Sequence, residues 1–387
     1  MQGLRTRLRK VTAGIAVAAA AAVIATTAPA ALADPPAGSG GKEVVPRSYD
    51  VVGVGANTDE NLFNQLSADY NKTIPASKHN ANHPYFYNFN ATAPGSTSAK
   101  PTHIVPKTGC PSIVRPNGST AGLTALDQNQ FDGKTGHYCI DFARSSSSRS
   151  TKAPKAGPGG VIYVALAKDA LTWATRAAKS GGSNAPATLT KAQLQGIFTC
   201  KTTNWKQVGG NAGAIKVYLP QTGSGTLSAW EKFMGITILG SCVNLSLEEN
   251  QGESAQFNNP NAIFIYSIAD WVAQKYHSPF CGAKPKAGQN TFGCDVTGFL
   301  ALDKIGGVAP TTAAKVPVIN PAFPAGFFRT LYDIVRWTAK TPDHIYARLE
   351  SFFSSKALHG FLCSSPVATK DIENYGFIPT ATCGSTS

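Results

Sequence analysis

The residues of this chain that are best suited to chemistry lie in three turns rich in glycine, serine and threonine. They are 53–58 (GVGANT), 118–122 (GSTAG) and 223–226 (GSGT), and a fourth polar segment, 144–146 (RSS), follows an apolar stretch. A helix start presents unpaired backbone N–H groups and the positive end of the helix dipole. Several such turns facing one cleft would bind a phosphate-like group, whereas any single turn is better explained as an ordinary helix cap.

The elements that must position these turns alternate between strands and helices. Apolar runs predict short strands at 49–54, 112–114, 139–143, 161–166, 215–219 and 262–266. Apolar residues at helical spacing predict helices after each turn, with Asn57 and Thr190 as N-caps and Glu60 and Gln193 in capping boxes. Phe327, Phe328, Leu331, Ile334 and Val335 predict a late amphipathic helix. This alternation indicates an α/β protein with a largely parallel sheet, whose ligands sit beyond the carboxyl ends of strands.

Two lobes are expected because about 350 residues exceed what one hydrophobic core usually organises. Residues 34–47 read as a linker and 72–110 as an irregular insertion, while 150–160 and the strand 262–266 are candidate crossovers. The predicted division is 48–155 plus 265–387 for lobe 1 and 156–264 for lobe 2.

Residues 1–33 resemble a secretory signal, with a basic start, an apolar stretch from Val11 to Ala30 and the small-x-small site Ala31-Leu32-Ala33. We expect cleavage before Asp34, no membrane span in the mature chain, and a secreted or cell-wall-associated protein. No cysteine lies near the cleavage site to carry a lipid.

Charge and cysteine content narrow the class of protein further. Without residues 1–33 the chain has 31 Lys and Arg against 22 Asp and Glu, which suits an anionic ligand or surface. The basic residues are scattered, so nucleic acid is not an expected partner. An even number of cysteines in an exported chain predicts disulfides. Eight cysteines allow about 105 pairings, which sequence does not distinguish, and the simplest one joins sequence neighbours: Cys110–Cys139, Cys200–Cys242, Cys281–Cys294 and Cys363–Cys383.

Other candidate sites are weaker. His79 and His83 are four residues apart but lie in a segment with Pro84, so a surface loop is expected rather than a metal site. Glu248, Glu249 and Glu253 lie in a polar segment and are expected to be solvated. No nucleophile elbow or phosphate-cradling P-loop occurs, and no cofactor is expected.

Several motifs together resemble the phosphate-type solute-binding proteins of ABC transporters. The segment 218–230 (YLPQTGSGTLSAW) resembles their Gly-Ser-Gly-Thr ligand loop, and 189–198 with 203–205 resembles the segment before it. Residues 141–146 (DFARSS) resemble their Asp-Phe-Gly-Ala-Ser-Asp strand end, 117–122 their first-lobe turn and 262–266 their return strand. The matches follow family order over roughly 50–270.

The resemblance implies a two-lobed type II periplasmic-binding fold that closes over a small anion, most simply phosphate. By position it implies these ligand-binding residues: Asn57, Thr58, Ser119, Thr120, Ser145, Ser146, Gln221, Ser224, Gly225 and Thr226. Two positions depart from the family, because its loop arginine is Pro220 here and its strand-end aspartate is Ser146. Arg144 is a candidate for the missing positive charge. The resemblance implies a monomeric binding protein, not an enzyme, with an ABC permease as a possible partner. The alternatives are a secreted hydrolase or a cell-wall protein that keeps the scaffold with another ligand or none.

Overall fold

The computed structural model describes residues 45–93, 101–128, 131–132, 137–151, 153–276 and 295–387. The predicted signal and residues 34–44 of the predicted linker lie outside these residues. Among the described residues, no helix combines the length and the apolar character that crossing a membrane requires.

One mixed sheet runs through the molecule in the order β11-β10-β12-β8-β15-β7-β1-β2, with β13 and β16 also paired to β8. Its strands are β1 (Val51–Gly55), β2 (Phe86–Asn88), β7 (Phe142–Ser145), β8 (Val161–Arg176), β10 (Lys216–Pro220), β11 (Val243–Leu247), β12 (Ala262–Ser267), β13 (Leu300–Leu302), β15 (Phe328–Arg336) and β16 (Ile378–Pro379). Short pairs form outside it: β3 (His103–Ile104) with β4 (Ile113–Val114), β5 (Phe131–Asp132) with β6 (His137–Tyr138), and β9 (Thr188–Leu189) with β14 (Lys304–Ile305).

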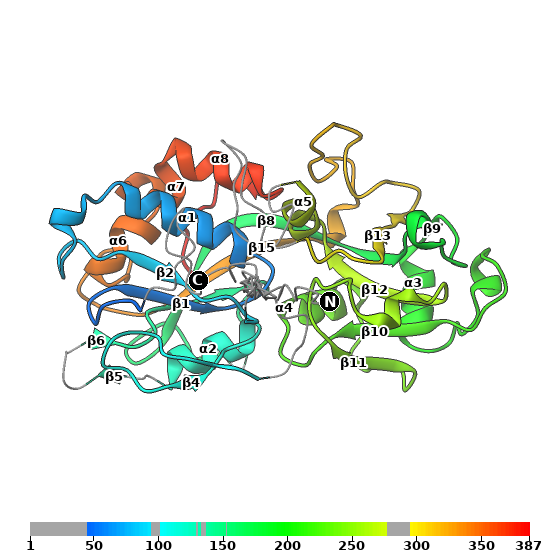
Figure 1. Cartoon of the computed structure of the whole chain (residues 1–387), viewed down its shortest axis with the longest axis horizontal. Coiled ribbons are helices and arrows are strands. Elements are labelled where there is room, and N and C mark those ends of the chain that lie inside the picture. Colours follow the sequence, from blue (N-terminus) through cyan, green and yellow to red (C-terminus); the bar gives the residue numbers. More distant parts are fainter. Residues whose placement is uncertain (1–44, 94–100, 129–130, 133–136, 152, 277–294) are drawn as a thin grey trace, which may run out of the picture.

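Helices cover this sheet in two groups (Figure 1). They are α1 (Glu60–Lys72), α2 (Ser119–Asp127), α3 (Lys191–Phe198), α4 (Gly225–Met234), α5 (Ile268–Tyr276), α6 (Ala347–Phe353), α7 (Phe361–Ser364) and α8 (Pro366–Asn374). The α1, α2, α6, α7 and α8 helices surround β1, β2 and β7, whereas α3 and α4 lie with β10, β11 and β12. Two lobes result, as the sequence predicts.

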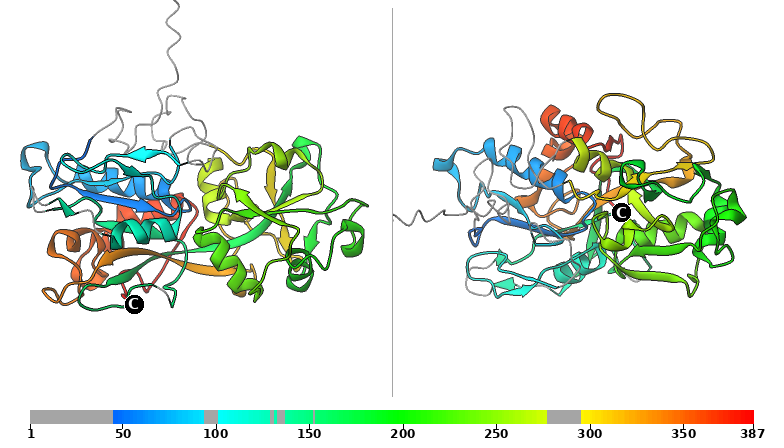
Figure 2. Two further views of the ribbon diagram at one scale, coloured as in Figure 1. Left: turned by 90° about the horizontal axis from the view of Figure 1, so that it is seen from below. Right: turned by 45° about the vertical axis from the view of Figure 1, so that its right-hand side comes forward.

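Strands β8 and β15 join the lobes. The first part of β8 pairs with β15 from Val161 to Ala170, and its last residues pair with β12 and β13. Nearly every β8 residue is buried on both faces of the sheet, which explains its long apolar sequence. Figure 2 shows both strands running across the base of the two lobes.

The residue boundaries of the two lobes remain a prediction, and the pairing of strands β13 and β14 is relevant to them. Strands β13 and β14 fall within the range 265–387 that was assigned to lobe 1. They pair with the end of β8 and with β9, which belong with the second lobe.

Each lobe has its own aromatic packing. In the first lobe Phe86 stacks on Phe352 with ring centroids 4.3 Å apart. In the second lobe Trp173, Trp205 and Trp230 are fully buried. The Thr190–Gln193 capping box at the start of α3 is also confirmed.

Three of the expected disulfides are present: Cys110–Cys139, Cys200–Cys242 and Cys363–Cys383. The Cys281–Cys294 pairing lies outside the described residues. Each observed bond closes a loop within one region of the chain, so it restricts the unfolded ensemble locally.

The structure corrects three expectations about secondary structure. Residues 328–336 form strand β15 and not a helix, because Thr330, Tyr332, Ile334 and Val335 favour an extended chain that pairs on both sides. Helix α1 begins at Glu60 with Asp59 at its N-cap position, so the cap at Asn57 is wrong. The irregular segment 72–110 contains β2, which extends the sheet parallel to β1.

Candidate functional site

Three strand-to-helix turns meet between the lobes. The backbone N–H of Thr120 in α2 donates to the carbonyl of Gly223 before α4 at 3.2 Å. Gly118 and Gly223 have φ of +95° and +92°, in the left-handed region that favours glycine. A Cβ on Gly118 would also lie 3.0 Å from the Gly223 carbonyl oxygen. The turn glycines therefore allow the starts of α2 and α4 to approach each other across the lobes.

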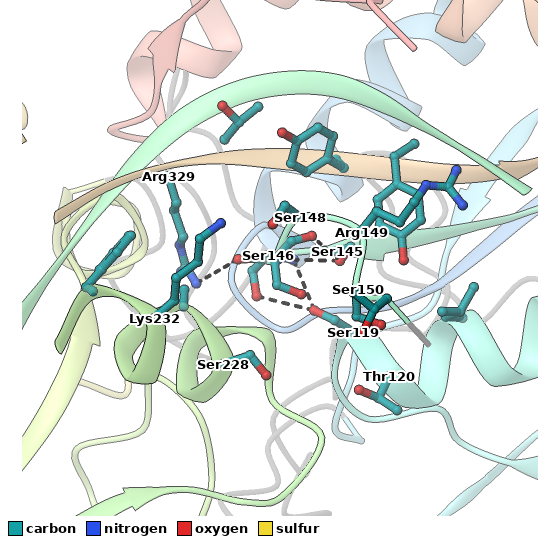
Figure 3. A pocket seen from close by; sticks show the side chains of 18 of the residues that line it. Ser119, Thr120, Ser145, Ser146, Ser148, Arg149, Ser150, Ser228, Lys232 and Arg329 are labelled. Carbon is teal, nitrogen blue, oxygen red and sulfur yellow. Dashed lines mark hydrogen bonds between the residues drawn. The ribbon is translucent and has the colours of Figure 1, made fainter. Parts of the chain in front are cut away.

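A pair of serine hydroxyls lies at this meeting point (Figure 3). Ser119 begins α2 and Ser146 follows β7, and their Oγ atoms are 3.4 Å apart. The backbone N–H of Ser146 donates to Ser119 Oγ at 3.0 Å. A Cβ on Gly225, the first residue of α4, would collide with both hydroxyls. The Gly-Ser-Gly-Thr loop therefore needs glycine at this position.

Arg329 from β15 forms a closed hydrogen-bonded ring with three residues. Its Nη1 donates to Thr226 Oγ1 at 2.9 Å and its Nη2 to Thr58 Oγ1 at 3.2 Å. Both hydroxyls in turn donate to Glu249 Oε1, at 2.5 and 2.6 Å. Thr58 comes from the first lobe and Thr226 and Glu249 from the second, so this ring, which we call the Arg329 ring, ties the lobes together.

Arg329 also connects the ring to the serine pair and to a second carboxylate. Its Nη1 donates to the Ser146 carbonyl at 3.0 Å. Its Nε and Nη2 lie 2.9 and 2.8 Å from Asp169 Oδ2. Arg329, Asp169 and Glu249 are all buried. The carboxylates of Asp169 and Glu249 therefore offset the positive charge of Arg329 inside the protein.

Asp59 adds a third carboxyl group beside the ring. It is fully buried, neither oxygen has a hydrogen-bond partner among the described residues, and Arg144 Nε lies 3.7 Å away. Burial raises the pKa of Asp59 to about 7, against the lowering effect of Arg144. The site therefore changes its charge near neutral pH. Within the described residues, no three His, Cys, Asp or Glu side chains are grouped so that they could hold a metal ion.

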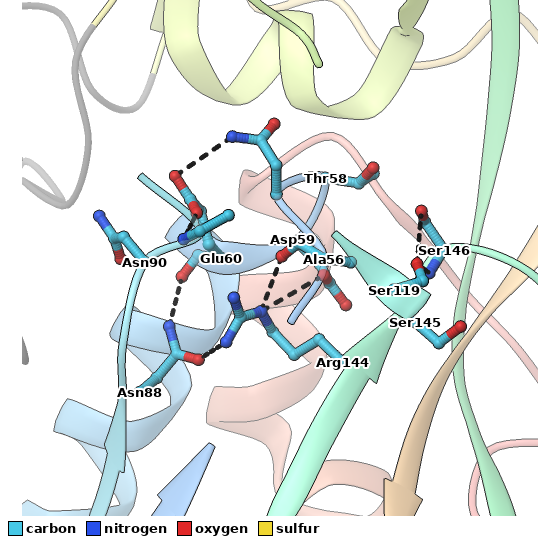
Figure 4. Close-up of polar contacts among 12 residues, drawn as sticks. Ala56, Thr58, Asp59, Glu60, Asn88, Asn90, Ser119, Arg144, Ser145 and Ser146 are labelled. Carbon is cyan, nitrogen blue, oxygen red and sulfur yellow. Dashed lines mark hydrogen bonds and ion pairs between the residues drawn. The ribbon is translucent and has the colours of Figure 1, made fainter. Parts of the chain in front are cut away.

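Arg144 is not brought to the ring. Its Nε donates to the Ala56 carbonyl at 3.0 Å, its Nη1 to Asn88 and its Nη2 to the Phe89 carbonyl at 3.1 Å. Figure 4 shows the guanidinium directed at Asn88, Ala56 and Asp59 in the first lobe. The structure thus gives Arg144 a place in holding the β1–α1 turn against β2, and Arg329 supplies the cation of the site.

Two other predicted ligand residues lie in a neighbouring polar network. Asn57 accepts a hydrogen bond from Asn250 Nδ2 at 3.2 Å. Gln221 donates to Asn117 at 3.1 Å and to Glu248 at 3.3 Å. Burial raises the pKa of Glu248 to about 7. These side chains link the lobes beside the ring and do not enter it.

The remaining predicted residues lie at the edge of the serine pair. Ser224 Oγ accepts from the Leu227 N–H at 3.1 Å and caps α4. Ser145 Oγ donates to the Ser147 carbonyl at 2.9 Å. The Thr120 side chain is exposed. Of the predicted set, Thr58, Ser119, Ser146, Gly225 and Thr226 therefore form the centre of the site.

Sequence analysis missed two residues of this centre. Arg329 lies 103 positions after Thr226, and no local motif marks it. Glu249 was expected to be solvated, yet it is fully buried and Glu248 is only 4% exposed. Hydrogen bonds from Thr58 and Thr226 compensate the buried charge of Glu249. Glu253 is exposed, as expected.

Comparison with known proteins places this geometry in a family. The model of a family described as a PBP superfamily domain matches residues 46–319. A putative phosphate ABC transporter substrate-binding protein with bound phosphate from Clostridium perfringens is similar in structure, with a TM-score of 0.51 and 16% identity over 86% of this chain and 99% of that one. An ABC-type phosphate transport receptor from Vibrio cholerae has a TM-score of 0.48 and 20% identity over 85% and 99%. No curated protein matches in sequence.

Proposed function

The chain belongs to the PBP superfamily, and we propose that it captures a small protonated oxyanion, in the first place hydrogen phosphate, between its two lobes. The observation that carries this proposal is the Arg329 ring, in which one buried cation donates to a hydroxyl from each lobe. An anion that engages Arg329 and both hydroxyls would hold the lobes together.

Helix starts supply the other donors. The first N–H groups of a helix have no acceptor within the helix, and its dipole favours negative charge there. The starts of α2 and α4 approach each other beside Ser119 and Ser146. Two helix N-termini, two serine hydroxyls and one arginine together fit a tetrahedral anion with several oxygens.

Glu249 would select for an oxyanion that carries a proton. Its Oε2 is buried and has no hydrogen-bond partner among the described residues. An oxygen that still bears hydrogen can donate to this atom, whereas a fully deprotonated anion would face the carboxylate charge without compensation. Hydrogen phosphate has such a proton at neutral pH and sulfate does not, so we expect phosphate to be preferred.

The same proposal covers the identity of the ligand, the export of the chain and the delivery of the ligand. The Clostridium perfringens structure holds phosphate, and phosphate is our first candidate here. We propose that the chain is exported by its N-terminal segment and delivers the ligand to an ABC permease. We also propose that it is not an enzyme, because the Ser224 hydroxyl accepts the Leu227 N–H in a helix cap and is not held by a base.

Thr226→Val tests the proposal by titration calorimetry with phosphate and with sulfate. The variant keeps the shape of the side chain but removes the hydroxyl that joins Arg329 and Glu249. A hydrogen bond to a charged group contributes about 1.5–3 kcal/mol, so phosphate affinity should fall roughly ten- to hundred-fold. Thr237→Val, at an exposed threonine of the same lobe, is the matched control. No phosphate binding by the folded wild-type protein, or equal affinity for sulfate, would refute the proposal.

A further inference from the structure

A cleft of about 530 Å³ adjoins the serine pair and Arg329. Ser119, Ser146 and Arg329 form its inner wall, and it extends past the segment 145–151 and the exposed side of α4 (Figure 3). At about 30 Å³ for each water molecule, this volume corresponds to roughly fifteen to twenty waters. A single oxyanion occupies a small part of such a space, which is in the usual range for organic ligands, about 300–1,000 Å³.

Hydroxyl groups dominate the walls of the cleft. The run Ser145 to Ser148 lines one side, together with Ser150, and Ser228 of α4 lines the other. Ser148, Ser150 and Ser228 are exposed, so their hydroxyls are accessible to a ligand. Binding of a lone oxyanion at Ser119 and Ser146 leaves Ser148, Ser150 and Ser228 unused. Closely spaced hydroxyls suit a ligand that itself carries several hydroxyl groups.

The cleft also holds a cation that no carboxylate offsets. Lys232 lines it together with Arg149 and Arg329, and none of its described lining residues is acidic. Lys232 is exposed and makes no ion pair within the described residues. Arg149 donates to the Val161 carbonyl at 2.7 Å and to an oxygen of Ser387, the last residue of the chain, at 2.6 Å, so part of its charge is offset there. Lys232 contrasts with the Arg329 ring, where internal carboxylates offset the cation.

Aromatic rings complete the lining. Tyr163 and Tyr332 meet edge to face with centroids 5.9 Å apart, and Phe233 and Phe328 line the cleft near α4 and β15. A surface that combines hydroxyls, cations and ring faces suits a phosphorylated polyol, whose carbon skeleton can contact the rings while its hydroxyls pair with serines.

We propose that the cleft binds the polyol part of a phosphate monoester, with the phosphoryl group at Ser119, Ser146 and Arg329. This inference rests on the proposed oxyanion function and extends it from free phosphate to esters. Below the second pKa of a phosphate monoester, about 6, the phosphoryl group keeps one protonated oxygen that can donate to Glu249, and the ester oxygen points into the cleft. Lys232 lies at the same end of the cleft as Arg329 (Figure 3) and adds a donor for the ester.

Titration calorimetry of the full mature chain at about pH 5, where the esters carry a proton, with glycerol 3-phosphate, glucose 6-phosphate and inorganic phosphate tests this inference. We expect one ester to bind at least tenfold more tightly than inorganic phosphate. Ser228→Phe, which places a ring in the cleft, should abolish this preference and leave inorganic phosphate affinity within twofold. Ser228→Ala, which removes the same hydroxyl without adding a ring, is the matched control. Lys232→Ala should weaken ester binding about fivefold, and Lys191→Ala, at an exposed lysine of the same lobe, should not change it.

The outcomes separate this inference from the proposed function. Binding of phosphate with no gain for either ester would overturn the ester inference and leave the proposed function intact. Binding of neither phosphate nor esters by folded protein would refute both. Equal binding of glycerol or glucose without the phosphate group would also overturn the inference, because the phosphoryl contacts would then contribute nothing.

Discussion

Replacement of Asp59 by asparagine should stabilise the protein, and more so as the pH rises. Asp59 is fully buried beside the Arg329 ring, neither of its oxygens is hydrogen-bonded to a described residue, and Arg144, its ion-pair partner among these residues, is 3.7 Å away. Its pKa rises from 3.8 to about 7 because burial disfavours the charged form. Asparagine has a similar shape and is neutral at every pH.

The sign and size of the effect follow from the two pKa values. Between pH 4 and 7 the folded protein keeps a proton on Asp59 that the unfolded chain releases, so stability falls as the pH rises through this range. A difference of about three between the pKa values corresponds to at most about 4 kcal/mol, at 1.36 kcal/mol per pKa unit. The free energy of unfolding of Asp59→Asn should therefore equal that of wild type near pH 4 and exceed it by a few kcal/mol at pH 8.

Urea denaturation at pH 5 and pH 8 measures this difference. Other buried acids also make the free energy of unfolding depend on pH. Their contribution is the same in the variant and in wild type, so it cancels when the two proteins are compared. Asp127→Asn, at an exposed aspartate at the end of α2, controls for the removal of a charge. If Asp59→Asn shifted stability by the same amount at both pH values, the argument from burial would be refuted.

Three further changes test other parts of the account. Glu249→Gln removes the acceptor for the ligand proton together with a repelling charge, so competition titrations should show the preference for phosphate over sulfate falling at least tenfold; an unchanged ratio would exclude the proposed role. Gly225→Ala would force apart the serine hydroxyls that meet α4, so phosphate binding should fall more than tenfold by calorimetry, while Gly326→Ala, which has open space around it, should have no effect. Replacing both Cys200 and Cys242 by serine opens a loop of 42 residues and should cost up to about 4 kcal/mol; an unchanged melting temperature would contradict this.

Local signals in the sequence predicted the scaffold well. The Thr190–Gln193 box begins α3, and the Gly-Ser-Gly-Thr turn leads into α4. These features depend on a few neighbouring residues, so spacing alone identifies them. The same turns contributed Thr58, Ser119 and Thr226 to the site.

Elements determined by distant contacts were not predictable in this way. Residues 328–336 fit a helical spacing as well as an extended one, and pairing with β7 and β8 makes them a strand. Arg329 reaches the site only because that strand crosses between the lobes. Glu249 appears solvated in a polar segment, and its burial is explained by Thr58 and Thr226, which lie 191 and 23 positions away.

A crystal structure of the protein grown with phosphate would test the central claim most directly. The account predicts a tetrahedral anion between the lobes, within hydrogen-bonding distance of the Arg329 guanidinium, the Thr226 hydroxyl and the start of α2, with one oxygen directed at Glu249. Phosphate bound elsewhere, or an anion held by Arg144 in place of Arg329, would contradict it.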